Sequence, residues 1–281
     1  MLAQDAPAKV NLTLRVGPRR ADGYHEIESV VVRASLCDRV AVERRDDGRV
    51  TVECDAPGIP ADERNLAVRA GLALRELAGP PRGAHIRLTK RIPAGAGLGG
   101  GSSNAATTLR LLDTLWETGL DDGALERIGA GIGSDVPFFL HGPCCVIRGR
   151  GERIERLSAD WAAWAVLLLP PIPLASADVY RAFDRLPPPP ARAPLPEQAA
   201  STLGMEALFN DLESAAFHLS PELADLAQRA AELAGGPVRM SGSGSTLFRL
   251  SESAAAARNL AQRCADKLGV RSAVVQLGAY C

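Results

Sequence analysis

The sequence is poor in lysine, although it is not poor in positive charge. Lysine occurs only at Lys9, Lys90 and Lys267, so nearly all of the 32 basic residues are arginine. These basic residues are balanced by 33 acidic ones, which gives a net charge of -1. A general nucleic-acid-binding protein depends on an excess of positive charge, and this chain has none. Because arginine is the default cation here, the few lysines are candidates for specific roles.

The chain also lacks long apolar runs and paired cysteines. Its longest apolar run, residues 161–169, is far shorter than the roughly 20 residues that a transmembrane helix needs. Residues 1–5 lack the basic and then apolar pattern of a signal peptide. The six cysteines form no C-x-x-C pair, so we expect neither a zinc site nor a disulfide framework. We therefore predict a cytoplasmic protein with reduced thiols and no membrane or nucleic-acid partner.

Strand and helix patterns mix irregularly along the chain. In residues 9–16 apolar and polar positions alternate, which predicts a strand with Lys9 and Asn11 on one face. Further strands are predicted over residues 29–35, 39–44, 50–53, 85–89, 164–169, 238–240, 246–250 and 272–277. Helices are predicted over residues 66–77, 103–117, 122–132, 177–184, 222–234 and 253–268.

This order lacks the regular alternation of a parallel doubly wound sheet, and it favours an α+β protein with two lobes. The length is also typical of two domains. We place the N-terminal domain at residues 1–157 and the C-terminal domain at residues 158–281. Residues 187–196 hold six prolines, which exclude a regular helix or a central strand, and we interpret them as a loop within the second domain.

A glycine-rich segment, residues 93–103, is the clearest candidate binding site. Its five glycines let the backbone approach a ligand closely, and a predicted helix follows them. The first amides of a helix are unpaired and, with the helix dipole, attract anions such as phosphate. The segment therefore predicts a phosphate-binding loop. Its candidate residues are Pro93, Ala94, Gly95, Ala96, Gly97, Leu98, Gly99, Gly100, Gly101, Ser102 and Ser103.

Two other nucleotide patterns compete for this segment. Gly95, Gly97 and Gly100 satisfy the G-x-G-x-x-G spacing of dinucleotide-binding enzymes. However, the element after the helix is another predicted helix, so no second parallel strand offers an acid to a ribose. We therefore disfavour an oxidoreductase. The Walker pattern is absent because no lysine follows the glycines, so the cation of a phosphate site must come from elsewhere in the chain.

Lys9 and Asp135 are the candidate catalytic pair. Lys9 offers a compact ammonium, unlike the forked guanidinium of the common arginines. Asp135 directly precedes an apolar run, so we expect it to be partly buried. A carboxylate can accept the proton of a hydroxyl while an ammonium stabilises the charge left on its oxygen. The alternative interpretations are a surface lysine and an ordinary helix-end aspartate.

Three motifs, taken in order, resemble those of the GHMP small-molecule kinases. They are Pro-Ala-Lys-Val-Asn-Leu at residues 7–12, the glycine segment extended to residue 106, and Ser-Gly-Ser-Gly-Ser-Thr at residues 241–246. Residues 20–25 and 133–138 further resemble the branch that phosphorylates a methylerythritol unit carried on cytidine diphosphate, in the methylerythritol phosphate route to isoprenoid precursors. The resemblance is weaker over residues 161–221.

The resemblance implies a two-lobed fold with an N-terminal α/β lobe and a ferredoxin-like C-terminal lobe. It also implies that ATP, with Mg²⁺, phosphorylates the tertiary 2-hydroxyl of the methylerythritol unit to give the 2-phosphate and ADP. The glycine segment would hold the ATP phosphates, Asp135 would be the general base, and Lys9 would lie beside it. A kinase acting on homoserine, mevalonate or a sugar is the nearest alternative, and a binding module without catalysis is a second.

The resemblance also implies the contacts to the acceptor substrate. Asn11 would position it, His25 would read the cytosine edge, and Tyr24 and Tyr180 would stack on the base. The third motif would line the phosphate and diphosphate region through Ser241, Gly242, Ser243 and Gly244. Ser103 is the nearest hydroxyl candidate for a Mg²⁺ ligand, and no carboxylate partner for it stands out in the sequence. We expect either a monomer or a homodimer.

Overall fold

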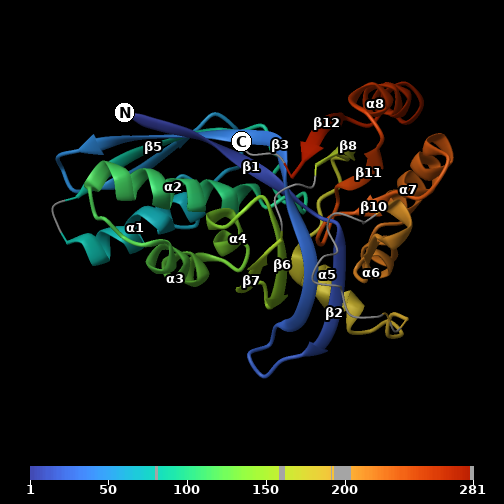
Figure 1. Ribbon diagram of the computed structural model, residues 1–281, viewed down its shortest axis with the longest axis horizontal. Coiled ribbons are helices and arrows are strands. Elements are labelled where there is room, and N and C mark those ends of the chain that lie inside the picture. Colours follow the sequence, from blue (N-terminus) through green and yellow to red (C-terminus); the bar gives the residue numbers. More distant parts are fainter. Residues whose placement is uncertain (80–81, 158–161, 191, 193–203, 279–281) are drawn as a thin grey trace.

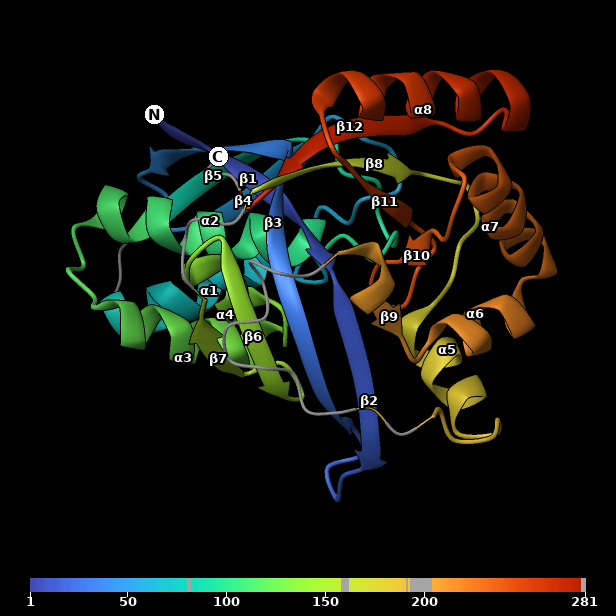
Figure 2. The same cartoon turned by 45° about the vertical axis from the view of Figure 1, so that its right-hand side comes forward.

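The protein is described by a computed structural model that covers residues 1–79, 82–157, 162–190, 192 and 204–278. Its centre is a sheet of 12 strands within these residues, with helices packed against it (Figures 1 and 2). Neighbouring strands are mostly antiparallel, as expected for an α+β protein rather than a doubly wound one. No helix of the described chain is long and apolar enough to cross a membrane.

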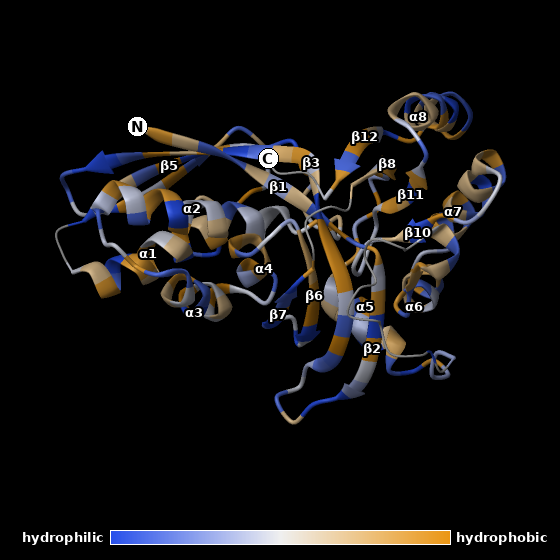
Figure 3. Ribbon diagram, viewed as in Figure 1, coloured by the Kyte–Doolittle hydropathy of each residue, from blue (hydrophilic) through white to orange (hydrophobic). Residues whose placement is uncertain are grey.

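The longest strand, β3 (His25–Arg45), organises the N-terminal half. It pairs with β1 (Leu2–Asn11) and β2 (Thr13–Arg19), and also with β5 (Gly83–Thr89) and β6 (Cys144–Gly149). Figure 3 shows the long apolar stretch that this strand contributes to the core. Strands β4 (Val50–Cys54) and β7 (Arg153–Arg156) extend this part of the sheet through β5 and β6.

The two strands predicted over residues 29–35 and 39–44 are a single strand, so their separation was wrong. The reason is a bulge opposite β1. Pro7 pairs with Cys37 but the next residue, Ala8, pairs with Ala34, so two residues of β3 have no partner on that side. The extra residues interrupt the alternation of apolar and polar positions on which the sequence prediction depends.

Four helices cover one face of the N-terminal half: α1 (Leu66–Ala78), α2 (Gly100–Trp116), α3 (Asp122–Ile132) and α4 (Val136–Leu140). Asn65 caps α1, since its side chain accepts a hydrogen bond from the amide of Ala67. Helix α2 begins at Gly100 rather than at residue 103. Two glycines occupy its first turn, and their poor helix propensity concealed that turn in the sequence.

The C-terminal half has the predicted ferredoxin-like arrangement. Its strands run in the order β10-β11-β8-β12, and α7 and α8 pack with them around one core. The strands are β8 (Ala163–Leu168), β10 (Arg239–Met240), β11 (Leu247–Ser251) and β12 (Ser272–Leu277). The helices are α5 (Ser176–Phe183), α6 (Glu213–Leu219), α7 (Pro221–Ala234) and α8 (Ala254–Leu268), with a short 3₁₀ turn at Met205–Ala207.

The sheet continues from one half into the other. Leu277 of β12 pairs with Ala34 of β3, and β9 (Phe209–Asn210) pairs in parallel with β2. The domain boundary at 157/158 stays a prediction. Residues 187–190 are neither helix nor strand, while most of the remaining proline-rich loop, residues 191 and 193–196, lies outside the described residues.

Candidate active site

A cavity of about 950 Å³ contains most of the predicted site. Its walls come from segments that are far apart in sequence: β1, the glycine loop, the N-terminus of α4, helix α5 and the third motif. All predicted site residues line it except Ser103, Ser241 and Gly244. The fold therefore brings the three sequence motifs together around one space.

Lys9 and Asp135 face each other in this cavity. The Nζ atom of Lys9 lies 3.4 Å from Oδ2 of Asp135. Lys9 is only 6% exposed, whereas the Asp135 side chain is 36% exposed and therefore accessible to a ligand. Asp135 occupies the N-cap position of α4, yet its side chain caps no amide of that helix. Its carboxylate thus keeps acceptor capacity for a proton from a bound hydroxyl.

Asn11 lies on the same strand face as Lys9, as the alternation predicted. Its Oδ1 accepts a hydrogen bond of 2.6 Å from Lys9 Nζ. Its Nδ2 donates to the hydroxyl of Ser29, on β3, over 2.8 Å. Sequence reasoning missed Ser29, although a serine that precedes three consecutive valines was a signal of a buried polar group.

The glycine loop is clamped between β1 and the third motif. The amide of Lys9 donates to the carbonyl of Leu98 over 2.9 Å, and the Ser241 hydroxyl donates to the Gly97 carbonyl over 3.2 Å. Gly97 has a φ of +76°, and a Cβ there would overlap the carbonyl oxygen of Ser241. Only glycine fits at this contact. Ser241 therefore supports the cavity wall from behind, while Gly242 and Ser243 line it.

The first turn of α2 opens into the cavity. Its N-cap is Gly99, which offers no side chain to the first amides of the helix. Uncapped amides at a helix N-terminus form an anion site. Ser102 lines the cavity there, whereas Ser103 is fully buried and its hydroxyl has no hydrogen-bond partner among the described residues.

The buried carboxylate of Asp38, on β3, binds the backbone of the segment that leads into the glycine loop. It accepts hydrogen bonds from the amides of Arg91 (2.7 Å) and Ile92 (2.9 Å). It also pairs with the ammonium of Lys90, which in turn donates to Asn104 Oδ1 over 3.0 Å. Lys90 and Asn104 both line the cavity. The role of Asp38 was missed because it depends on partners more than 50 residues away.

The opposite end of the cavity carries aromatic side chains. The rings of His25 and Tyr180 are stacked, with centroids 5.3 Å apart and an interplanar angle of 20°. Asp184 lies 2.8 Å from Nε2 of His25. Burial, together with the negative charge of Asp135, raises the pKa of the Tyr180 phenol well above its usual value. Tyr24 is 53% exposed, and the guanidinium of Arg150 lies 5.5 Å from its ring centroid.

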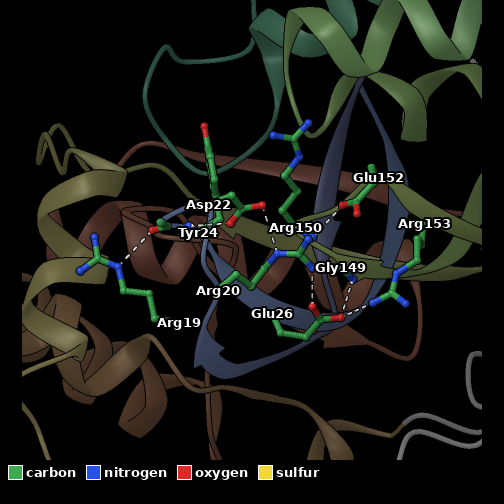
Figure 4. A network of polar contacts seen from close by, with 10 residues as sticks. Arg19, Arg20, Asp22, Tyr24, Glu26, Gly149, Arg150, Glu152 and Arg153 are labelled. Carbon is green, nitrogen blue, oxygen red and sulfur yellow. Dashed lines mark hydrogen bonds and ion pairs between the residues drawn. The ribbon is translucent and has the colours of Figure 1, made fainter.

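Glu26 joins the turn that carries Tyr24 to the turn that carries Arg150 (Figure 4). It accepts hydrogen bonds from Arg20 Nη1 (2.6 Å) and from the amide of Gly149 (3.2 Å), and it pairs with Arg153. The hydrogen bond from Arg20 is the main cause that lowers the pKa of Glu26. This network of polar contacts fixes the rim of the cavity at its aromatic end.

The fold and the site together define a GHMP kinase. The family described as "GHMP kinases N terminal domain" matches residues 65–143, and "GHMP kinases C terminal" matches residues 197–269. More narrowly, the chain belongs to the family of the 4-diphosphocytidyl-2-C-methyl-D-erythritol kinases. The protein of that name from Shouchella clausii is 40% identical over 252 residues, which cover 88% of this chain and 84% of the relative.

Two further comparisons support this assignment. A protein of the same name from Citrifermentans bemidjiense is 39% identical over 272 residues, covering 96% of this chain and 97% of the relative. A crystal structure of 4-(cytidine 5'-diphospho)-2C-methyl-D-erythritol kinase superposes with a TM-score of 0.81 at 38% identity. It covers 99% of this chain and 100% of that chain. The match therefore includes both lobes and the cavity between the three motifs.

Proposed function

We propose that this chain transfers the γ-phosphoryl group of ATP to the tertiary 2-hydroxyl of 4-diphosphocytidyl-2-C-methyl-D-erythritol. The products are the 2-phosphate and ADP, and the reaction belongs to the methylerythritol phosphate route to isoprenoid precursors. The observation that carries the proposal is the Lys9–Asp135 pair, 3.4 Å apart, in one cavity with an anion-binding loop and an aromatic end. The names of the relatives supply the identity of the acceptor.

ATP binds at the glycine loop. The amides of residues 94–102, which include the uncapped start of α2, face its phosphates. Apolar side chains of Ile59, Leu66 and Leu88 line the same cavity and can accept the adenine ring. Ser103, buried behind the loop, acts there as support rather than as a direct contact.

Asp135 accepts the proton of the 2-hydroxyl, and Lys9 stabilises the oxygen as it attacks the γ-phosphorus. Phosphoryl transfer needs mainly positioning and stabilisation of charge on a loose transition state. The ammonium of Lys9, which is only 6% exposed, provides such charge with little competition from water. The two groups therefore act on the same oxygen, one as base and the other as electrostatic support.

The aromatic end selects the cytidyl group. His25 reads the cytosine edge, and its hydrogen bond with Asp184 fixes the orientation of the ring. Tyr24 and Tyr180 contribute stacking surfaces, and Asn11 helps to hold the methylerythritol unit. Gly242 and Ser243 line the diphosphate region, with Ser241 and Gly244 behind them.

Mg²⁺ belongs to the proposal as a partner of ATP. Within the described chain no group of three or more His, Cys, Asp or Glu residues could hold a metal ion. The ion would therefore be bound mainly by phosphates and water, a mode that Mg²⁺ favours. The hydroxyl candidate from the sequence, Ser103, is fully buried, whereas Ser102 lines the cavity and would offer its hydroxyl instead. The ion would neutralise phosphate charge.

We also propose that the N-terminal and C-terminal domains divide at residues 157/158. We propose that the protein is a monomer or a homodimer.

The proposal is tested by ADP release from Mg-ATP with four acceptors: diphosphocytidyl-methylerythritol, mevalonate, homoserine and galactose. We expect release that depends on the cytidyl compound alone. Release with mevalonate or homoserine instead would assign the chain to another GHMP activity. No acceptor-dependent release, with ATP still bound, would favour a binding module.

A further inference from the structure

A short chain of buried hydrogen bonds runs away from the catalytic lysine into the sheet. Lys9 Nζ donates to Asn11 Oδ1, and Asn11 Nδ2 donates to Ser29 Oγ. The Ser29 hydroxyl then donates to the main-chain carbonyl of Thr13. Asn11 is 3% exposed and Ser29 is fully buried, so water does not compete for these groups.

The donor and acceptor roles along this series of hydrogen bonds are determined at its buried end, the carbonyl of Thr13. A carbonyl oxygen can only accept, so the proton of the Ser29 hydroxyl is committed to Thr13. The Ser29 oxygen is then an acceptor, and it binds the amide nitrogen of Asn11 rather than its oxygen. The Asn11 carbonyl is thereby turned toward Lys9, where it meets an ammonium that can only donate.

The aliphatic part of Lys9 packs closely against the glycine loop, since a Cβ added at Gly99 would lie only 2.9 Å from Lys9 Cγ. A Cβ added at Gly242 would lie 3.4 Å from Lys9 Nζ and 3.3 Å from Asn11 Oδ1. Gly242 of the third motif therefore lies near the ammonium. The carbonyl of Asn11 accepts the 2.6 Å hydrogen bond that holds the ammonium 3.4 Å from Asp135. A reversed Asn11 amide would present N–H groups to the ammonium and displace it.

We propose that Ser29 is a positioning residue for phosphoryl transfer. It orients Asn11, and through Asn11 it holds the Lys9 ammonium beside Asp135 and the acceptor hydroxyl. This role rests on the proposed kinase function, in which Lys9 supports the attacking oxygen. Ser29 touches neither substrate, so it affects the rate of transfer rather than the binding of ATP.

The test is a double-mutant cycle in kcat between Ser29→Ala and Asn11→Ala. We expect Ser29→Ala alone to lower kcat on the order of 10-fold or more, because small misplacements of a catalytic group are costly, with KM for ATP unchanged. In the Asn11→Ala background the same change should cost almost nothing further. Ser29→Thr keeps the hydroxyl and should recover most of the rate.

A matched control is Thr108→Val, which removes another fully buried hydroxyl that donates to a main-chain carbonyl, that of Asn104 over 2.7 Å. It should lose stability in urea unfolding without the coupling to Asn11→Ala. Wild-type kcat in Ser29→Ala, or a loss that adds in full to that of Asn11→Ala, would overturn the proposal.

A second readout does not depend on the substrate. The ¹⁵N signal of the Lys9 ammonium in the free protein should be sharp in wild type and broadened or lost in Ser29→Ala. An unchanged signal contradicts the positioning role. If wild type fails to phosphorylate the cytidyl compound, the proposed function fails, and this signal still decides whether Ser29 orders Lys9.

Discussion

At the scale of single residues, Lys9 is the point where the strand, the glycine loop and the third motif meet. We expect Lys9→Arg to lower kcat at least about 10-fold while ATP still binds, because a planar guanidinium cannot replace a compact ammonium in this space. Steady-state kinetics and calorimetry of ATP binding measure the two effects. Lys267→Arg, at an exposed position of α8, is the control. Normal turnover by Lys9→Arg would contradict a specific role for the ammonium and would show that the scarcity of lysine reflects only the amino-acid composition.

Asp135 is tested by an isosteric change that removes only its basicity. Asp135→Asn should lower kcat by roughly 10²- to 10⁴-fold, the usual contribution of a general base, with little change in ATP affinity. The exposed Asp5→Asn, which removes a surface ion pair with Arg39, should leave turnover unaffected. Turnover near wild type in Asp135→Asn would remove this residue from the role of base.

The candidate pair could be predicted from the sequence, but its supporting residues could not. Lys9 and Asp135 stand in short motifs that carry the resemblance to the kinase family. Ser29 and Asp38 act through partners that only folding brings near, since Asp38 binds the backbone at residues 91 and 92. A buried polar residue reveals its partner only when the strand register is known.

At the scale of elements, the glycine loop works because it packs against the third motif. Gly97→Ala should reduce kcat/KM for ATP far more than Gly95→Ala. Both glycines have a positive φ, of +76° and +66°, so both substitutions carry similar backbone strain. Only at Gly97 would the new Cβ strike another segment, at the carbonyl of Ser241, whereas nothing lies within 4 Å at Gly95.

The comparison of these two variants isolates the contact between loop and motif. Circular dichroism and urea unfolding establish that both variants fold. Equal losses in the two variants would show that loop flexibility, rather than this contact, limits ATP binding.

Elements with local signals were predicted well. Helices α1 and α8 begin next to Asn65 and Ser253, whose side chains cap them, and the predicted starts at residues 66 and 253 lie within one residue of the observed ones. Sequence reasoning missed β6, β7, α4, β9 and α6. Strand β9 has two residues and α4 has five, too few for a periodic pattern, and their conformation is imposed by the elements around them.

At the scale of the whole molecule, the continuous sheet was not foreseen. The two lobes were predicted from the mixture of strands and helices, but the pairing of β3 with β12 joins residues more than 240 positions apart. Strand partners at such distances leave no periodic trace in a single sequence. The cavity depends on this assembly, because Lys9, Asp135 and Gly242 come from three distant segments.

The reactivity of the buried cysteine thiols tests how the strands pack in the folded protein. Burial raises the pKa of Cys144 to about 12 and that of Cys145 to about 11, so almost no thiolate exists at pH 8 in the folded state. We expect both to resist a thiol-specific reagent in native protein and to react fully in urea, as measured by mass spectrometry of labelled peptides. The half-buried Cys37 and Cys54 serve as the internal comparison and should react faster. Rapid native labelling of Cys144 would contradict the packing of β6 against β3.

The identity of the product tests the proposed phosphoryl transfer directly. Purified protein would be incubated with Mg-ATP and 4-diphosphocytidyl-2-C-methyl-D-erythritol labelled with ¹³C at carbon 2 and at the methyl group, and the product examined by ³¹P and ¹³C NMR. We predict one ADP per turnover and a new phosphate monoester coupled to the tertiary carbon 2. A phosphate on another hydroxyl, or no new monoester while ATP is hydrolysed, would contradict this prediction.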